Sequence, residues 1–100
     1  MSIILGIDPG SRFTGYGIIS FTNNTISHVH HGTIRTTGED FSNRLYQIYA
    51  ELNAIIAEHQ PVATAIENVF FAKNAQSALK LGQARGAAIT SIASNNLPLS

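Results

Sequence analysis

The spacing of apolar residues changes near residue 40, and this change limits the folds that the chain can adopt. Residues 3–7, 16–21 and 26–36 are short apolar-rich runs, which predict three successive β-strands. Turn-forming pairs separate these runs, namely Pro9–Gly10 and Asn23–Asn24. Residues 41–56 instead carry apolar side chains three or four positions apart, which predicts an amphipathic helix. We therefore expect an antiparallel strand meander followed by a helix.

A second strand and a second helix are expected after the first helix. Asp40 is positioned to cap the first helix, and Pro61 to end it, because a proline disfavours helical geometry at the residue before it. Residues 62–67 then predict a short fourth strand. Asn74 is positioned to cap a second helix that runs to Asn95.

This element order predicts an α/β fold with a mixed five-stranded sheet flanked by helices. The first three strands are expected to be antiparallel, and a right-handed crossover through the first helix lays the fourth strand parallel to the first. Residues 97–99 resemble the start of a fifth strand. We expect residues 1–100 to form one domain that stops before its last strand and helices.

Composition excludes several classes of protein. The 100 residues are 44% hydrophobic and 12% charged, which supports a buried core and argues against intrinsic disorder. There is no cysteine, so disulfide scaffolds, thiolate zinc sites and thiol nucleophiles are excluded. No uninterrupted apolar run approaches the roughly 20 residues that span a bilayer. We therefore expect a cytoplasmic protein without a membrane partner.

Two acidic residues are expected to meet at one edge of the sheet. Asp8 ends the first strand and Glu67 ends the fourth, and parallel neighbours place such residues together at their carboxyl ends. Two carboxylates with only oxygen ligands favour a hard ion such as Mg²⁺ or Mn²⁺. In the alternative interpretation, Asp8 only forms an Asx-turn with Pro9 and Gly10, and Glu67 is a solvated strand end.

The segment after Glu67 contains features that suit a nucleic-acid substrate. Phe70 and Phe71 are adjacent, so one of them could be exposed to stack on a base, although both could instead pack between helix and sheet. Residues 68–100 contain three cations and no acid, which gives them a charge of +3 against −3 for residues 1–67. These cations are Lys73, Lys80 and Arg85; a solvated basic helix face is the alternative, for Lys80 in particular.

Other polar residues give weaker indications. Ser11 and Arg12 follow the Pro9–Gly10 turn and could contact a phosphate, although loop solvation explains them equally well. His28, His30 and His31 could suggest a metal site. His28 and His30 are expected to share one strand face, but no third ligand at a useful spacing accompanies them, which favours a partly solvated strand. No phosphate-loop, nucleophile-elbow or kinase motif is present.

The second helix has a stripe of small residues. Ala78, Gly82 and Gly86 recur at every fourth position, and glycine inside a helix costs about 1 kcal/mol relative to alanine. The stripe predicts a close approach of this helix either to the sheet or to a partner helix.

Five blocks in this order resemble the bacterial RuvC Holliday-junction resolvase family. The blocks are residues 6–11 (GIDPGS), 14–17 (TGYG), 66–70 (IENVF), 72–75 (AKNA) and 78–86 (ALKLGQARG). The resemblance implies an RNase H-like fold and a homodimeric endonuclease that cuts four-way DNA junctions. It also implies two Mg²⁺ ions per active site and the RuvA–RuvB branch-migration complex as a partner.

The resemblance also implies roles for individual residues. Asp8 and Glu67 match the first two metal ligands, and Phe70 matches an aromatic residue that stacks on an unpaired base. The helix that carries Gly82 and Gly86 matches a helix at the subunit interface. Apart from the resemblance, the residue types make five further residues candidates for DNA contacts: Phe71, Lys73, Arg85, Ser11 and Arg12.

The chain departs from the family pattern in one respect. The family supplies two further metal-binding acids on a later helix, whereas no acid follows Glu67 here. We therefore expect little or no nuclease activity from these 100 residues alone. Two alternatives remain open: a non-catalytic RNase H-like module that dimerises or binds DNA, and a fragment of an actin-like ATPase, whose phosphate-binding turn Asp8-x-Gly10-Ser11 resembles.

Overall fold

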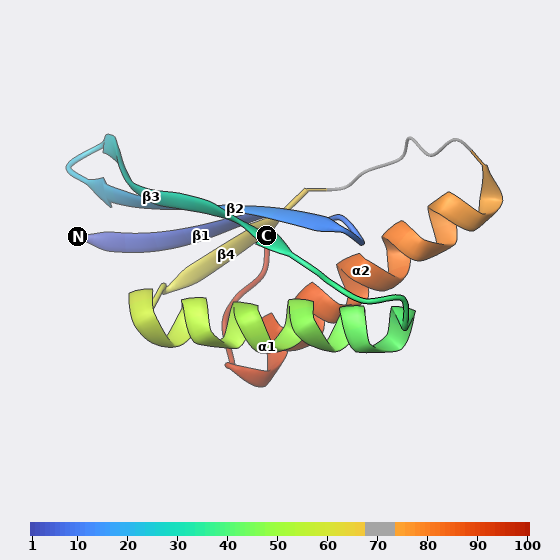
Figure 1. The fold of residues 1–100 in the computed structure, drawn as a ribbon. Coiled ribbons are helices and arrows are strands. Elements are labelled where there is room, and N and C mark those ends of the chain that lie inside the picture. The colour runs from blue at the N-terminus through green and yellow to red at the C-terminus, as the bar shows by residue number, and fades with distance from the viewer. Residues whose placement is uncertain (68–73) are drawn as a thin grey trace.

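The computed structural model describes residues 1–67 and 74–100, which form a mixed sheet with two helices on one side (Figure 1). The elements in chain order are β1 (Ser2–Asp8), β2 (Phe13–Thr22), β3 (Thr25–Arg35), α1 (Phe41–His59), β4 (Ala63–Ile66) and α2 (Ala75–Ser94). The strand order is β3-β2-β1-β4. β1, β2 and β3 are antiparallel neighbours, and β4 is parallel to β1. The predicted meander and the parallel pairing of the fourth strand with the first are confirmed.

The predicted fifth strand is reduced to a single bridge in the described residues. Leu99 pairs with Thr64 of β4 in parallel orientation. The Thr64 N–H donates to the carbonyl oxygen of Pro98 over 2.9 Å, and the N–H of Ser100 donates to the Thr64 carbonyl over 2.9 Å. The last residues therefore continue the sheet beyond β4 without adding a full strand.

Local sequence signals explain where the elements begin and turn. Asn23 and Asn24 join β2 to β3 with φ values of 52° and 65°, a left-handed geometry that asparagine tolerates well in two-residue hairpins. A carboxylate oxygen of Asp40 accepts from the N–H of Ser42 over 3.1 Å and caps α1. The side chain of Asn74 caps α2 by accepting from the backbone of the third helical residue over 2.9 Å. Both predicted caps are confirmed.

The core lies between the helices and one face of the sheet. Alternate strand residues such as Leu5, Ile7 and Ile18 are buried there, because successive side chains of a strand point to opposite faces. They pack against Ile48 and Leu52 of α1 and against a set of residues from α2: Ala84, Ala88 and Ile92. The opposite side of the sheet, hereafter the open face, carries no helix in the described part of the chain (Figure 1).

The small-residue stripe of α2 does not face the sheet. Ala78, Gly82 and Gly86 are all exposed, and a Cβ atom added at either glycine would meet nothing within 4 Å. Ala84 and Ala88 make the close approach to the sheet instead. Of the two predicted roles, contact with the sheet is wrong, and contact with a partner helix stays a prediction.

A β-bulge in β3 changes the predicted orientation of its histidines. His30 pairs with Ile18 and His28 with Ile19, so Val29 has no partner in register. Because one extra residue reverses the alternation, His30 lies on the helix side with Ile18 whereas His28 lies on the open face. The prediction that His28 and His30 share a face is therefore wrong.

Neither helix in the described ranges is long and apolar enough to cross a lipid bilayer.

Candidate active site

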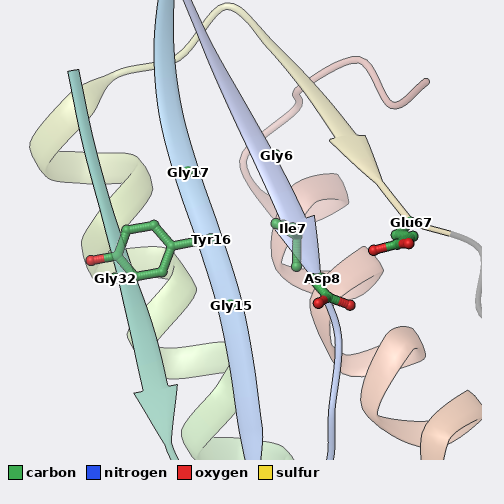
Figure 2. A pocket seen from close by; sticks show the side chains of 8 residues that line it. All are labelled: Gly6, Ile7, Asp8, Gly15, Tyr16, Gly17, Gly32 and Glu67. Carbon is green, nitrogen blue, oxygen red and sulfur yellow. The ribbon is translucent and has the colours of Figure 1, made fainter. Parts of the chain in front are cut away.

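Asp8 and Glu67 lie beside each other at the carboxyl ends of two parallel strands. β1 and β4 are in register up to the pair formed by Ile7 and Ile66. The N–H of Glu67 then donates to the carbonyl oxygen of Ile7 over 2.9 Å, which extends the pairing by one residue. In Figure 2 the Glu67 side chain is directed toward Asp8. These two residues are hereafter the acid pair.

The surface next to the acid pair is open because glycines form much of its floor. A depression of about 410 Å³ is lined by both acids and by Gly6, Gly15 and Gly17, with Ile7, Tyr16 and Gly32 (Figure 2). A Cβ atom at Gly6 or Gly17 would meet nothing within 4 Å. A bulky ligand such as a nucleic-acid backbone can therefore approach the acid pair across the open face.

The donor set of the acid pair suits a hard divalent cation. Both side chains are exposed, and in residues 1–67 and 74–100 neither carboxylate forms an ion pair with a basic side chain. Two neighbouring carboxylates repel each other, and a bound cation removes this repulsion while accepting the oxygen ligands that Mg²⁺ and Mn²⁺ prefer. Within the same residues, no three His, Asp or Glu side chains converge, so this chain contributes a pair of acids.

The loop after Asp8 is held in place by hydrogen bonds and by a steric requirement. The N–H of Gly10 donates to the Thr14 hydroxyl over 3.2 Å, and this hydroxyl donates to the Gly10 carbonyl over 2.8 Å. A Cβ atom at Gly10 would overlap the backbone carbonyl oxygen of Phe13. The tight turn therefore requires glycine at this position, and it fixes the direction in which β1 ends at Asp8.

Ser11 and Arg12 follow the Gly10 turn in this loop, and their backbone carbonyls accept hydrogen bonds from Thr36 and from Arg44 of α1. The Ser11 carbonyl accepts from the Thr36 hydroxyl over 2.7 Å and from the Arg44 guanidinium over 3.4 Å. The Arg12 carbonyl accepts from the N–H of Thr36 over 3.0 Å, while its side chain is exposed. Neither Ser11 nor Arg12 is among the residues that line the depression beside the acid pair.

Arg44 is a residue near the site that the sequence did not single out. It is buried on α1, and its guanidinium carbon lies 5.2 Å from the centroid of the Phe41 ring. Arg44 stands one helical turn before Ile48 on the apolar stripe, so its position in the sequence predicts that its side chain is buried. This signal could have identified Arg44 from the sequence. It ties α1 to the loop that follows Asp8.

Lys80 and Arg85, the two remaining candidates in the described residues, do not line the depression beside the acid pair. Lys80 lies over the Phe41 ring, with 5.7 Å between its Nζ atom and the ring centroid, and Arg85 is half-buried on α2. The predictions for Phe70, Phe71 and Lys73 fall outside the described residues.

Comparison with known proteins identifies the family. The family model described as "Crossover junction endodeoxyribonuclease RuvC" matches residues 4–100. The RuvC protein of Vibrio vulnificus is 59% identical over 99 residues, which cover 99% of this chain and 57% of that protein. The chain therefore spans a little over half the length of this relative.

Solved structures show the same fold. Thermus thermophilus RuvC in complex with a Holliday junction substrate superimposes with a TM-score of 0.87 at 25% identity, and the match covers 99% of this chain and 62% of that one. A yeast mitochondrial Holliday junction resolvase matches with a TM-score of 0.72 at 15% identity, covering 98% of this chain and 48% of that one; this match shows the fold alone. The expected RNase H-like arrangement is confirmed, in the partial form of a four-stranded sheet with two helices. Taken with the match over residues 4–100, the chain belongs to the RuvC family of crossover junction endodeoxyribonucleases.

Proposed function

We propose that residues 1–100 are the N-terminal part of a structure-selective endonuclease that hydrolyses DNA phosphodiesters at four-way junctions. The observation that carries this proposal is the position of Asp8 beside Glu67 at the open edge of β1 and β4. The family match favours this function over an actin-like ATPase fragment or a non-catalytic module. The 100 residues would belong to one RNase H-like domain.

Asp8 and Glu67 would hold divalent cations, Mg²⁺ or Mn²⁺, two per active site. When bound, such ions make an attacking water more acidic and stabilise the charge that develops on the phosphate. The carboxylates would fix where the ions bind, and through the ions where the scissile phosphate binds, because β1 and β4 hold both acids at one sheet edge. The glycine floor leaves room for the DNA backbone, and the Gly10 turn keeps Asp8 in position.

The proposed substrate and partners follow from the family. The structure of the Thermus thermophilus relative contains a Holliday junction substrate. By analogy, Phe70 and Phe71 would contact unpaired bases, while Lys73, Arg85, Arg12 and Ser11 would contact phosphates. Two copies would pair through the exposed stripe that contains Gly82 and Gly86, and a RuvA–RuvB complex would deliver the junction.

Metal binding by the 100-residue chain tests the acid pair directly. The electron paramagnetic resonance signal of free Mn²⁺ is expected to fall when the chain is added. Asp8→Asn and Glu67→Gln should each lower Mn²⁺ affinity at least about tenfold, because each removes a direct ligand. Glu51→Gln is the matched control, since Glu51 is an exposed acid on α1, away from the pair. Equal affinities in all four proteins would contradict the proposed site.

Junction cleavage tests the whole proposal. The chain is joined after Ser100 to the segment of the Vibrio vulnificus relative that follows its matched region. This fusion is expected to cut a four-way junction, and Asp8→Asn should slow it at least about a hundredfold. The 100 residues alone should show little cleavage, because they carry only the acid pair. A fusion that binds Mn²⁺ and DNA but cuts equally well with Asp8→Asn would refute the catalytic role.

A further inference from the structure

We propose that His28 and His31 form a two-histidine site for a late transition-metal ion such as Ni²⁺ or Cu²⁺. The site lies on the open face of β3 and is separate from the acid pair. Nε2 of His28 and Nδ1 of His31 approach each other to 2.9 Å, and the ring centroids are 5.0 Å apart. Both side chains are exposed, so an ion can reach the two nitrogens from solvent.

The β-bulge at Val29 creates this arrangement. In a regular strand, residues three positions apart point to opposite faces. The register shift between Ile18 and Ile19 adds one residue to β3, so that His28 opposite Ile19 and His31 opposite Gly17 share the open face. The backbone of β3 thus holds the two rings together.

The spacing of the two nitrogens matches a chelate. Histidine nitrogens bind such ions at about 2.0–2.1 Å, so two nitrogens 2.9 Å apart subtend an angle of about 90° at a shared ion. This angle is the one between neighbouring ligands in square-planar or octahedral geometry, which Cu²⁺ and Ni²⁺ adopt with nitrogen ligands. The ion would lie to one side of the line between the two nitrogens, at bonding distance from both.

The ligand chemistry distinguishes this site from the acid pair. Imidazole nitrogen suits copper and nickel, whereas carboxylate oxygen suits Mg²⁺ and Mn²⁺. In the described ranges, no third His, Asp or Glu completes a cluster with these histidines. Water would therefore occupy the remaining positions around the ion.

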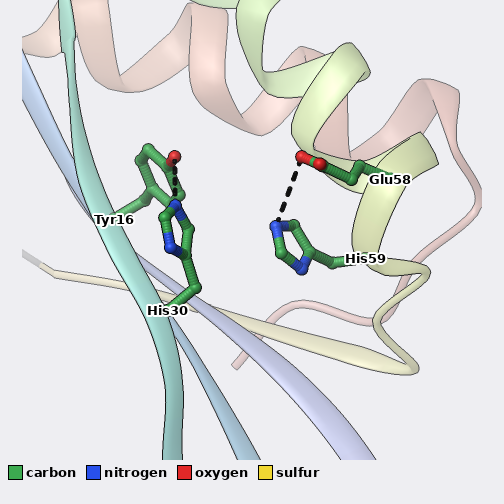
Figure 3. A network of polar contacts seen from close by, with 4 residues as sticks. All are labelled: Tyr16, His30, Glu58 and His59. Atoms are coloured by element: carbon green, nitrogen blue, oxygen red, sulfur yellow. Dashed lines mark hydrogen bonds and ion pairs between the residues drawn. The ribbon is translucent and has the colours of Figure 1, made fainter.

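His30 provides a matched control on the same strand. Its Nε2 lies 3.3 Å from the Tyr16 hydroxyl, and its ring stacks on His59 with 5.5 Å between centroids and 17° between planes (Figure 3). His59 in turn lies 3.5 Å from a carboxylate oxygen of Glu58. His30 thus faces the C-terminal end of α1, away from His28 and His31.

Calorimetric titration with Ni²⁺, in excess Mg²⁺, tests the site in the 100-residue chain. His28→Ala and His31→Ala should each lower Ni²⁺ affinity at least about tenfold, whereas His30→Ala should change it less than about twofold. Nitrogen hyperfine structure in the Cu²⁺ resonance spectrum should show two imidazoles in the unaltered chain and one in either site variant. His28→Gln and His31→Gln repeat the test with polar side chains, and circular dichroism confirms that each variant is folded.

Each outcome decides the proposal. Folded His28 and His31 variants that bind Ni²⁺ as the unaltered chain does would overturn it, as would an equal loss in His30→Ala. Asp8→Asn should leave Ni²⁺ binding unchanged while it lowers Mn²⁺ affinity at least about tenfold. The two-histidine site can therefore fail while the acid pair holds, and the reverse is also true.

Discussion

The two faces of the sheet consist of alternate residues from the same strands, yet they serve different purposes. On the helix side, Leu5, Ile7 and Ile18 are buried against α1 and α2. On the open face, their neighbours Gly6 and Asp8 leave room and supply charge. Strand alternation therefore separates most of the residues that stabilise this fold from those that offer chemistry.

Neighbouring isoleucines on β2 give the sharpest test of this contrast. Ile18→Ala should lower the free energy of unfolding by about 2–5 kcal/mol, because it leaves a cavity in a closely packed core. Ile19→Ala removes the same atoms from the open face and should cost less than about 1 kcal/mol. Urea denaturation measures both values. Similar losses in the two variants would show that the open face also contributes to the core.

Two glycines near the acid pair should respond with opposite signs. Gly10→Ala should destabilise the chain by about 1–3 kcal/mol, because the new methyl group overlaps the Phe13 carbonyl oxygen. Gly17→Ala meets no atom within 4 Å and should stabilise the chain by about 0.4–1 kcal/mol by restricting the unfolded state. Thermal unfolding of both variants, followed by circular dichroism, measures the difference. A loss at Gly17 equal to that at Gly10 would contradict the description of an open floor.

The cap of α1 should contribute less than the core that the helix covers. Asp40→Ala should lower stability by about 1 kcal/mol, since the N–H of Ser42 loses its acceptor. Asp40→Asn keeps an acceptor oxygen and is the control, with a smaller expected loss. The free energy of unfolding in urea distinguishes them. If both variants match the unaltered chain, the capping bond does not support the helix layer.

The acid pair should have the smallest effect on stability. Asp8→Asn and Glu67→Gln should change the free energy of unfolding by no more than about 0.5 kcal/mol, because both side chains are exposed and unpaired with basic groups in the described residues. At low ionic strength the change should be a gain, since each variant removes a repulsion between like charges. Urea denaturation at two salt concentrations measures the sign. A large loss would mean that these acids support the fold.

The sequence predicts the parts of this fold that depend on local signals and on strand connection rules. The Asn23–Asn24 turn, the caps at Asp40 and Asn74, and the parallel pairing of β4 with β1 are all confirmed. The adjacency of Asp8 and Glu67 follows from that pairing. These features were predictable because each depends on residue types at fixed offsets or on the handedness of a crossover.

Features that depend on packing between distant elements were not predictable. The bulge at Val29 arises where β3 pairs with β2. Strict alternation ignores this bulge, so it led to the wrong prediction that His28 and His30 share a face. Whether the stripe with Gly82 faces the sheet or faces away from it depends on which α2 residues meet the sheet, and the sequence alone does not say which do. The place of Arg44 on the apolar stripe predicts its burial, but the distant loop carbonyl that it contacts, that of Ser11, was not predictable. In each case the deciding contact lies far away in the sequence.

The bulge in β3 also affects how the molecule behaves in a crowded solution. β3 forms one rim of the sheet, and such a rim offers a template on which another extended segment can pair. Exposed apolar side chains, Ile26 and Val29, lie along this rim and would favour that association. The kink at Val29 interrupts the regular spacing of donors and acceptors, so an incoming segment cannot pair along the full length of the rim. The irregularity that brings two histidines together therefore also interrupts the template that a fibrous aggregate would need.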